Sequence, residues 1–144
     1  MAIFLGFTGE YTYALDAKGR LALPARYRSH FKSGVLVTTG VERCLYVYPP
    51  EAWEAKARQI EEKVLSAAQR RQVERAFFGR ACELELDAQN RVTLPARQRA
   101  YAHLENETVI VGTRDRLEIW NPGMYQETMQ QMNFEALAGL DLPF

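Results

Sequence analysis

The chain has 144 residues, 47% of them hydrophobic, which is enough to bury one core or two small modules that share a core without disulfide support. Its 18 basic and 18 acidic residues cancel, and this balance alone weighs against a nucleic-acid partner, because phosphate binding depends on positive charge. No apolar run approaches the roughly 20 residues of a membrane span, so we expect a cytoplasmic protein without a membrane partner.

The charges are unevenly distributed along the chain. Residues 16–32 carry five basic residues and one acid, a local net charge of +4. The basic residues are Lys18, Arg20, Arg26, Arg28 and Lys32. Residues 117–144 contain acids but no basic residue: Glu118, Glu127, Glu135 and Asp141. The overall neutrality is therefore an average over a basic face and an acidic tail.

The first part of the chain predicts two strands joined by a tight turn. Tyr11, Tyr13 and Leu15 alternate with smaller residues, which is the period of a half-buried strand. Residues 16–19 then fit a turn, because the Asp16 carboxylate accepts hydrogen bonds from nearby backbone N–H groups and Gly19 adopts positive φ at little cost. A second alternating run covers residues 20–23.

A short helix is predicted over residues 24–32. Pro24 suits its first position, because proline has a fixed φ and lacks a backbone donor. Tyr27 and Phe31, four residues apart, share the inner face, whereas Arg26 lies off that stripe. Strands are expected next at residues 35–39 and 44–48. These elements together form a β-β-α-β-β unit.

Residues 50–78 predict a helical hairpin. Pro50 opens the first helix, which we expect to end near residue 65 with a one-sided apolar stripe. The stripe consists of Trp53, Ala57, Ile60 and Val64. Ser66 and Gln69 have the spacing of a capping box for a second helix, which Gly79 is expected to terminate.

The first unit then recurs at an offset of 71. Residues 87–99 repeat residues 16–28 with eight identities in thirteen positions. The identical residues of the second copy are Asp87, Ala88, Arg91, Leu94, Pro95, Ala96, Arg97 and Arg99. Leu84 and Leu86 continue the alternation of a first strand, and residues 108–111 and 117–120 predict the last two. Asn90 replaces Gly19, and the turn is expected to survive because asparagine tolerates a left-handed backbone.

A last helix is predicted after Asn121 and Pro122. Its apolar stripe consists of Tyr125, Met129, Met132 and Ala136. Two partners remain open for this stripe: the chain's own body, or another subunit, since adaptable methionine surfaces also suit interfaces. Residues 141–144 are expected to form a loose tail.

The duplicated residues do not match an enzyme motif. The sequence lacks HExxH, GxxxxGK[ST] and any Ser, His and Asp arrangement, so we expect no enzyme, no cofactor, no metal and no small-molecule substrate. Cys44 and Cys82 are far apart without a CxxC, and we expect ordinary core residues rather than a disulfide or a zinc site. A hydrolase that pairs Asp16 with Asp87 is the remote alternative.

Arginine kept at three equivalent places points to nucleic acid. Planar guanidinium groups bind phosphate bidentately and read guanine edges in the major groove. The candidate DNA-binding residues are Arg20, Lys18, Arg26, Arg28, Arg91, Arg97 and Arg99. The candidate turn-organising residues are Asp16, Gly19, Asp87 and Asn90. Two alternatives stay open: structural ion pairs of Asp16 with Arg20 and of Asp87 with Arg91, and a merely solvated face for the arginines beyond each proline.

Three segments together resemble the MraZ family: Phe7-x-Gly9, Leu15 to Arg20, and Pro24 to Arg28, followed by the second motif at residues 86–99. The resemblance implies an α+β, mainly β fold of two AbrB-like (SpoVT-AbrB type) swapped-hairpin units that pair as barrel halves within one chain. It implies a transcriptional regulator of the bacterial division and cell-wall gene cluster, including its own operon. Such a protein binds short direct repeats of double-stranded DNA as a ring-like homo-oligomer, associated with the nucleoid. Arg20 and Arg91 would be the arginines of the DNA-facing loops.

We expect the first AbrB-like unit at residues 7–53, a connector at 54–78, the second unit at 79–122, and the C-terminal helix and tail at 123–144. The copies are unequal, because Lys18 and Gly19 face Gln89 and Asn90 in the alignment. We therefore expect the first turn to dominate on DNA. The alternative function is an oligomeric structural or partner-binding scaffold without DNA binding, with the arginines at subunit interfaces.

Overall fold

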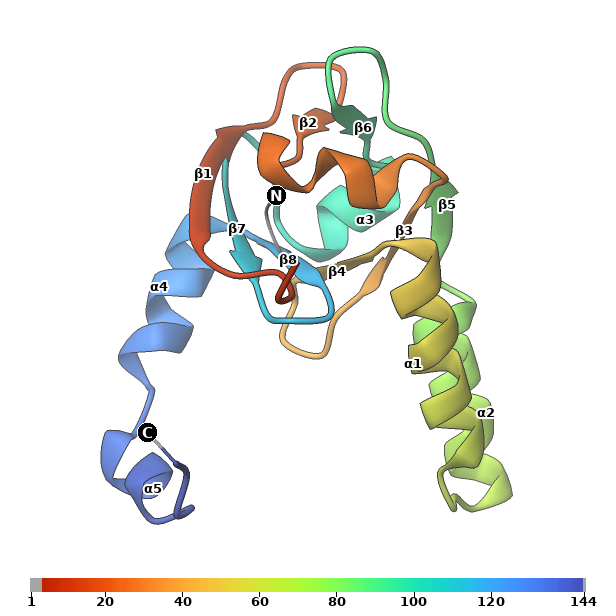
Figure 1. Cartoon of the computed structure of the whole chain (residues 1–144), viewed down its shortest axis with the longest axis vertical. Coiled ribbons are helices and arrows are strands. Elements are labelled where there is room, and N and C mark those ends of the chain that lie inside the picture. Colours follow the sequence, from red (N-terminus) through yellow and green to blue (C-terminus); the bar gives the residue numbers. More distant parts are fainter. Residues whose placement is uncertain (1–3, 144) are drawn as a thin grey trace.

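In the computed structural model, which describes residues 4–143, a curved β-sheet body carries two helical arms that extend from the same side (Figure 1). The strands of the body are β1 (Glu10–Ala14), β2 (Arg20–Ala22), β3 (Val35–Thr39), β4 (Leu45–Tyr48), β5 (Cys82–Leu84), β6 (Arg91–Thr93), β7 (Glu107–Gly112) and β8 (Leu117–Trp120). Two short helices cover it, η1 (Ala25–Phe31) and α3 (Ala96–Tyr101). One arm consists of α1 (Pro50–Glu62), α2 (Ala67–Val73) and η2 (Glu74–Phe78), and the other of α4 (Pro122–Gln130) and α5 (Phe134–Ala138).

The two units exchange strands. The main sheet is antiparallel with the order β1-β7-β8-β4-β3-β5, so the first strand of each unit pairs with the third strand of the other unit. β2 and β6 form a separate two-stranded ribbon in which Leu21 faces Val92. The duplicated β-β-α-β-β units and their swapped pairing within one chain are thereby confirmed.

Equivalent positions of the two copies fill one shared core. Leu21 and Leu23 of the first copy and Val92 and Leu94 of the second are each at most 1% exposed. They alternate along the ribbon with more exposed residues, as a strand with one buried face requires. Burying each of these side chains stabilises the fold by about 1.5–3 kcal/mol. Buried side chains from both copies therefore hold the ribbon against the shared core.

The short helices differ between the copies. η1 is a 3-10 helix that follows Pro24, and its buried residues are Tyr27 and Phe31, as predicted. α3 is a regular helix, and the residue equivalent to Tyr27 is the buried amide Gln98. The Tyr27 hydroxyl donates to the backbone carbonyl of Thr8 (3.0 Å) and accepts from its N–H (3.0 Å). Tyr27 thus ties η1 to the segment that precedes β1.

The first arm begins and ends as predicted but departs near its tip. The Ser66–Gln69 capping box is present in both directions (3.1 and 3.0 Å). α1 ends at Glu62, so Val64 leaves the predicted apolar stripe and is 94% exposed. The second helix ends at Phe78 with Gly79 as its C-cap, as predicted; the φ of Gly79 is −66°, and its N–H bonds to the carbonyl of Glu74 in a π-helical turn.

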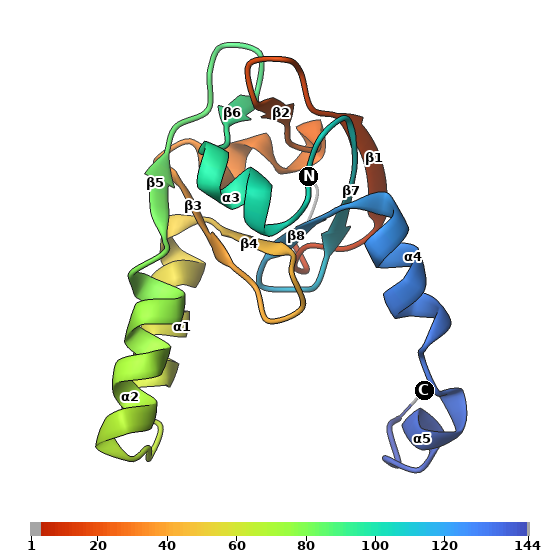
Figure 2. The ribbon, with the colours of Figure 1, turned by 180° about the vertical axis from the view of Figure 1, so that it is seen from behind.

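Aromatic side chains hold the base of this arm against the body. The Trp53 ring stacks on Phe77 with centroids 4.8 Å apart, and Tyr48 of β4 meets both rings edge to face. Thr38 also donates to the carbonyl of Phe77 (2.5 Å). The base is therefore fixed, whereas the tip around Val64 extends away from the body (Figure 2).

The second arm is not the single helix that the stripe predicted. It breaks at residues 131–133, where the Asn133 side chain accepts from the N–H of Ala136 and starts α5. At its base, Tyr125 packs against Trp120 (5.5 Å between centroids) and bonds to Glu10. The base thus packs on its own chain, whereas Phe134 in α5 is 70% exposed. Phe144, the end of the expected tail, lies outside the described residues.

No helix within residues 4–143 is long and apolar enough to cross a membrane. Cys44 is a buried free thiol, and Cys82 is a half-buried one. Burial raises the pKa of Cys44 to about 12, so this thiol is protonated and unreactive at neutral pH.

Candidate nucleic-acid interface

The two duplicated turns lie side by side at the end of the body opposite both arms (Figures 1 and 2). The β2–β6 ribbon holds them together, and two reciprocal backbone bonds continue it. Leu23 N–H donates to the carbonyl of Asn90 (3.1 Å), and Leu94 N–H donates to the carbonyl of Gly19 (2.8 Å). Each turn is therefore attached to the strand that follows the other turn.

Asp16 organises the first turn. Its Oδ1 accepts from the backbone N–H groups of Lys18 (2.9 Å) and Arg20 (2.8 Å), and its Oδ2 accepts from Arg20 Nε (2.6 Å). Gly19 closes the turn with a φ of 77°, and its N–H donates to the Asp16 carbonyl (3.0 Å). One carboxylate thus fixes the loop and the direction of the arginine that follows it.

Asp87 repeats this arrangement in the second turn. Its Oδ1 accepts from the N–H groups of Gln89 and Arg91 (both 2.9 Å), and its Oδ2 accepts from Arg91 Nε (2.9 Å). Asn90 takes a φ of 63°, so the exchange of glycine for asparagine leaves the turn intact, as expected. The Asp–Arg ion pair that the sequence left open as a structural alternative is present in both copies.

The electrostatics of these aspartates argue against a hydrolase. The pKa of Asp16 and that of Asp87 are both lowered, mainly because the backbone N–H of the following arginine bonds to the carboxylate. Arg91 Nη1 also lies 3.9 Å from Asp16 Oδ2, so this guanidinium stands between the two carboxylates. A carboxyl pair that shares a proton needs one raised pKa. Here both groups are carboxylates at neutral pH.

Two further arginines reach the turns from the short helices, each crossing to the opposite copy. Arg28 Nη2 donates to the carbonyl of Ala88 in the second turn (3.4 Å). The Arg99 guanidinium lies at the first turn, where a Cβ on Gly19 would stand 2.9 Å from its Nε. We name the resulting cluster the basic pole. It comprises Lys18, Arg20, Arg28, Arg91 and Arg99.

Arg26 and Arg97, the other two candidates, lie elsewhere. Arg26 Nη1 donates to the Tyr11 hydroxyl (3.5 Å), and its guanidinium lies 5.2 Å from the centroid of the Tyr27 ring. Arg97 Nη2 contacts Cys82 Sγ at 3.6 Å. Both arginines therefore lie beside the first strand of their own unit, and the structure does not bring them together with the basic pole.

Sequence reasoning missed the contacts that cross between the units. Asn90 not only tolerates the left-handed backbone but also donates from Nδ2 to the carbonyl of Leu23 (2.7 Å). The crossing of Arg28 and Arg99 was equally hidden, because the partners are far apart in the sequence. The one signal available was the duplication itself, which implies a pseudo-twofold arrangement of the turns.

The basic pole has the chemistry of an anion-binding surface. Arg20 uses Nε for Asp16, and its two Nη atoms make no hydrogen bond within the described part of the chain. A guanidinium held this way presents its outer N–H groups as a fixed fork, which suits phosphate oxygens and guanine edges. Lys18 and Arg28 are exposed beside it and add positive charge.

Comparison with known proteins gives a consistent result. The family model of the MraZ protein, described as putative antitoxin-like, matches residues 6–76 and again residues 77–139. A protein of Lactiplantibacillus plantarum named transcriptional regulator MraZ is 42% identical over 134 residues, which cover 92% of this chain and 95% of the relative. Proteins of the same name are 38% identical over 130 residues in Roseiflexus castenholzii (90% and 91%) and 41% identical over 116 residues in Thermomicrobium roseum (81% and 82%).

Proposed function

The chain belongs to the MraZ family, and we propose that it is a sequence-specific, DNA-binding transcriptional regulator without enzymatic activity. The observation that carries the proposal is the basic pole, where two copies of one turn meet at one end of the body. Five cationic side chains gather there around two carboxylates, although the whole chain is neutral. Such a local excess is what phosphate binding requires.

The geometry suggests a division of labour among the cations. Arg20 and Arg91 are held in place by their aspartates, so their forks are preorganised for base edges as well as phosphates. Lys18, Arg28 and Arg99 surround them and would contact phosphates, which position the protein without reading sequence. Arg26 and Arg97 are assigned no direct role at this surface.

We propose that the first turn contributes more than the second. Lys18 has Gln89 as its counterpart, so the first turn carries one more cation. Arg91 also lies within 3.9 Å of Asp16 in addition to its own Asp87, whereas no second carboxylate lies within 4.0 Å of Arg20 in residues 4–143. The guanidinium of Arg91 is therefore more fully neutralised.

One pole of this size neutralises few phosphates, so we propose that several chains act together. A ring-like homo-oligomer would place equivalent poles along short direct repeats and raise the apparent affinity through multivalency. Following the family, the proposed targets lie upstream of the chain's own operon in the division and cell-wall gene cluster. The proposed site of action is the cytoplasm, on the nucleoid.

Footprinting on the DNA upstream of the chain's own gene tests this proposal. The wild-type protein should protect a set of short, regularly spaced repeats. Arg20→Ala should abolish the footprint and Arg91→Ala should weaken it, whereas Arg26→Ala, the matched control on the side of the body, should leave it unchanged. A footprint that persists in both Arg20→Ala and Arg91→Ala would remove the basic pole from the DNA interface.

The exposed apolar residues of the second arm favour a further role in subunit contacts. Beyond its packed base, the arm exposes a series of large apolar side chains. They are Met129, Met132, Phe134, Leu140 and Leu142. If the arm binds a second copy of the chain, Phe134→Ser should reduce the mass measured by light scattering, whereas Val64→Ser at the tip of the other arm should not. If Arg20→Ala also reduces this mass, the scaffold function with interfacial arginines is favoured instead.

A further inference from the structure

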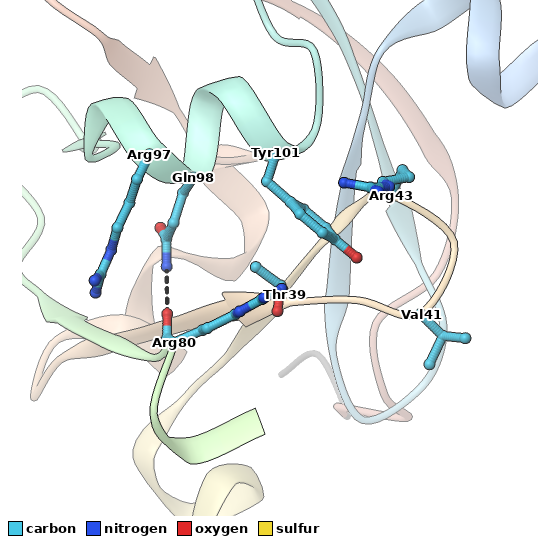
Figure 3. Close-up of a pocket in the computed structure, with 7 residues that line it drawn as sticks. All are labelled: Thr39, Val41, Arg43, Arg80, Arg97, Gln98 and Tyr101. Atoms are coloured by element: carbon cyan, nitrogen blue, oxygen red, sulfur yellow. Dashed lines mark hydrogen bonds between the residues drawn. The ribbon is translucent and has the colours of Figure 1, made fainter. Parts of the chain in front are cut away.

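A second basic site lies on the side of the body, between α3 and the loop that joins β3 to β4 (Figure 3). It is a cleft of about 540 Å³, which falls within the usual range of small-molecule sites, roughly 300–1,000 Å³. Its lining consists of Thr39, Val41, Arg43, Arg80, Arg97, Gln98 and Tyr101. Three of these residues are arginines, and none belongs to the basic pole.

The three arginines come from three different segments and line the cleft without a counter-charge. Arg43 belongs to the β3–β4 loop, Arg80 to the segment before β5, and Arg97 to α3. No carboxylate of residues 4–143 lies within 4.0 Å of any of the three guanidinium groups. The guanidinium carbons of Arg43 and Arg80 lie 4.8 and 5.8 Å from the centroid of the Tyr101 ring. Two of the three guanidinium groups thus lie at one aromatic ring, and Arg97, whose Nη2 contacts Cys82 Sγ at 3.6 Å, adds a third positive charge to the lining.

Buried hydrogen bonds make the floor of the cleft rigid. Gln98 is 1% exposed, and its Nε2 donates to the carbonyls of Val37 (2.9 Å) and Arg80 (3.1 Å). The Tyr101 hydroxyl donates to the carbonyl of Gly40. These bonds tie α3 to both other segments. Gln98 Oε1 is left buried without a partner in the described chain, so the polar requirements of this floor are incompletely met within the protein.

The duplication provides an internal comparison, because the pseudo-equivalent place in the fold lies between η1 and the loop that joins β7 to β8. Arg114 occupies there the turn position of Arg43, and both residues have a left-handed backbone, with φ of 77° and 64°. His30 replaces Tyr101, and the Phe4 ring covers it at 3.8 Å between centroids. Arg114 Nη1 is directed to the carbonyl of Leu5 (3.4 Å).

The cavity beside η1 also has a different charge. It is lined by aromatic rings and by two acids, Glu51 and Asp115, together with a single arginine. The same place in the fold is therefore covered and of mixed charge beside η1, but open and purely basic beside α3. Arg114 and Arg26 stand at the positions equivalent to Arg43 and Arg97, so the α3 side differs in having Arg80 and in having no acid in its lining.

We propose that the cleft beside α3 binds a small phosphate-bearing ligand. Arginine forks bind both carboxylates and phosphates, but a planar carboxylate offers only two oxygens in one plane. Guanidinium groups that approach from three segments suit the divergent oxygens of a tetrahedral phosphate. Val41, which is 86% exposed at the rim, and the Tyr101 ring provide apolar surface for the remainder of the ligand.

Isothermal titration calorimetry of the full chain with pyrophosphate as the probe tests this inference. We expect saturable binding with one site per chain. Arg43→Ala and Arg80→Ala should each weaken it by roughly tenfold, the effect of removing one charge-assisted hydrogen bond. The matched controls are equivalent residues on the η1 side. Arg114→Ala removes the charge equivalent to Arg43 and Arg26→Ala the charge equivalent to Arg97, and both variants should leave the affinity unchanged.

Three results would overturn the inference. The first is the absence of saturable binding at low salt. The second is an equal loss of affinity in Arg114→Ala, or a loss in Arg20→Ala, which would place the phosphate on the η1 side or at the basic pole. The third is equally tight binding of succinate, which would replace the phosphate by a carboxylate ligand. Circular dichroism of each variant shows that the fold is retained, since all five arginines are at least partly exposed.

Discussion

Replacing Gly19 by alanine perturbs the join between the two copies, because Gly19 has a φ of 77° and a Cβ there would lie 2.9 Å from Arg99 Nε. A left-handed backbone costs an alanine about 1–2 kcal/mol. The displaced guanidinium would give up its hydrogen bond to the carbonyl of Leu94 (3.0 Å), which contributes about 0.5–1.5 kcal/mol. We therefore expect Gly19→Ala to lower the free energy of unfolding by about 1.5–3.5 kcal/mol and Tm by roughly 5–12 °C.

Urea unfolding of the wild type, Gly19→Ala, Arg99→Ala and the double variant separates the two contributions. In the Arg99→Ala background only the backbone cost remains, so the cycle should give a coupling energy of about 0.5–1.5 kcal/mol. Gly34→Ala is the matched control, because Gly34 also has a positive φ (145°) but its nearest neighbour would be 3.7 Å away. It should show no coupling to Arg99. A coupling of zero for Gly19 would refute the contact between the first turn and the second copy's helix.

The same geometry sets three other expected outcomes. Because the folded-state pKa of Asp16 and of Asp87 lies below the ordinary 3.8, their contribution to stability is present above about pH 4 and is lost as the pH falls through the folded pKa. In the Asp16→Asn, Asp87→Asn double variant, the free energy of unfolding should fall less steeply as the pH is lowered below about 4 than in the wild type. The same acid dependence in both proteins would contradict the lowered pKa values. Leu21→Ala, at a position with 0% exposure, should cost about 3 kcal/mol in thermal unfolding, whereas Val41→Ala should cost less than about 0.5 kcal/mol; similar losses would contradict the core assignment. Arg28→Ala should reduce the slope of log K against log salt by about 0.9 in fluorescence anisotropy with operator DNA, whereas Arg26→Ala should not, and equal slopes would refute the division between pole and side.

Local pattern was sufficient for most of the body. The strand at residues 35–39 and the strand at 117–120 have the predicted bounds, because each is a short run that turn residues interrupt. The Asp–Arg pairs were also foreseeable, since donor and acceptor lie four residues apart within one turn. The conservative exchange at Asn90 preserved the left-handed backbone for the reason anticipated.

The wrong predictions have structural causes that the spacing of apolar residues along the sequence does not reveal. The helical spacing of apolar residues in the last helix continues through residues 131–133. The chain nevertheless breaks there, because the Asn133 side chain caps a new helix. The places of Arg28 and Arg99 depend on how β2 pairs with β6, and no periodicity within one unit contains that information.

The domain boundaries at residues 53, 78 and 122 stay predictions. The two family matches meet at residues 76 and 77, near the end of the first arm. α1 begins at Pro50, four residues before the expected connector.

The decisive measurement for the basic pole is the affinity of Arg20→Ala for the upstream DNA. It is measured by fluorescence anisotropy across a range of salt concentrations, with light scattering on the same samples. We expect a large loss of affinity and a salt slope that falls by about 0.9 for each phosphate that is no longer neutralised, with the oligomeric mass unchanged. Unchanged DNA affinity in Arg20→Ala, or weaker binding only together with dissociation of the oligomer, would contradict a DNA-reading role for this arginine.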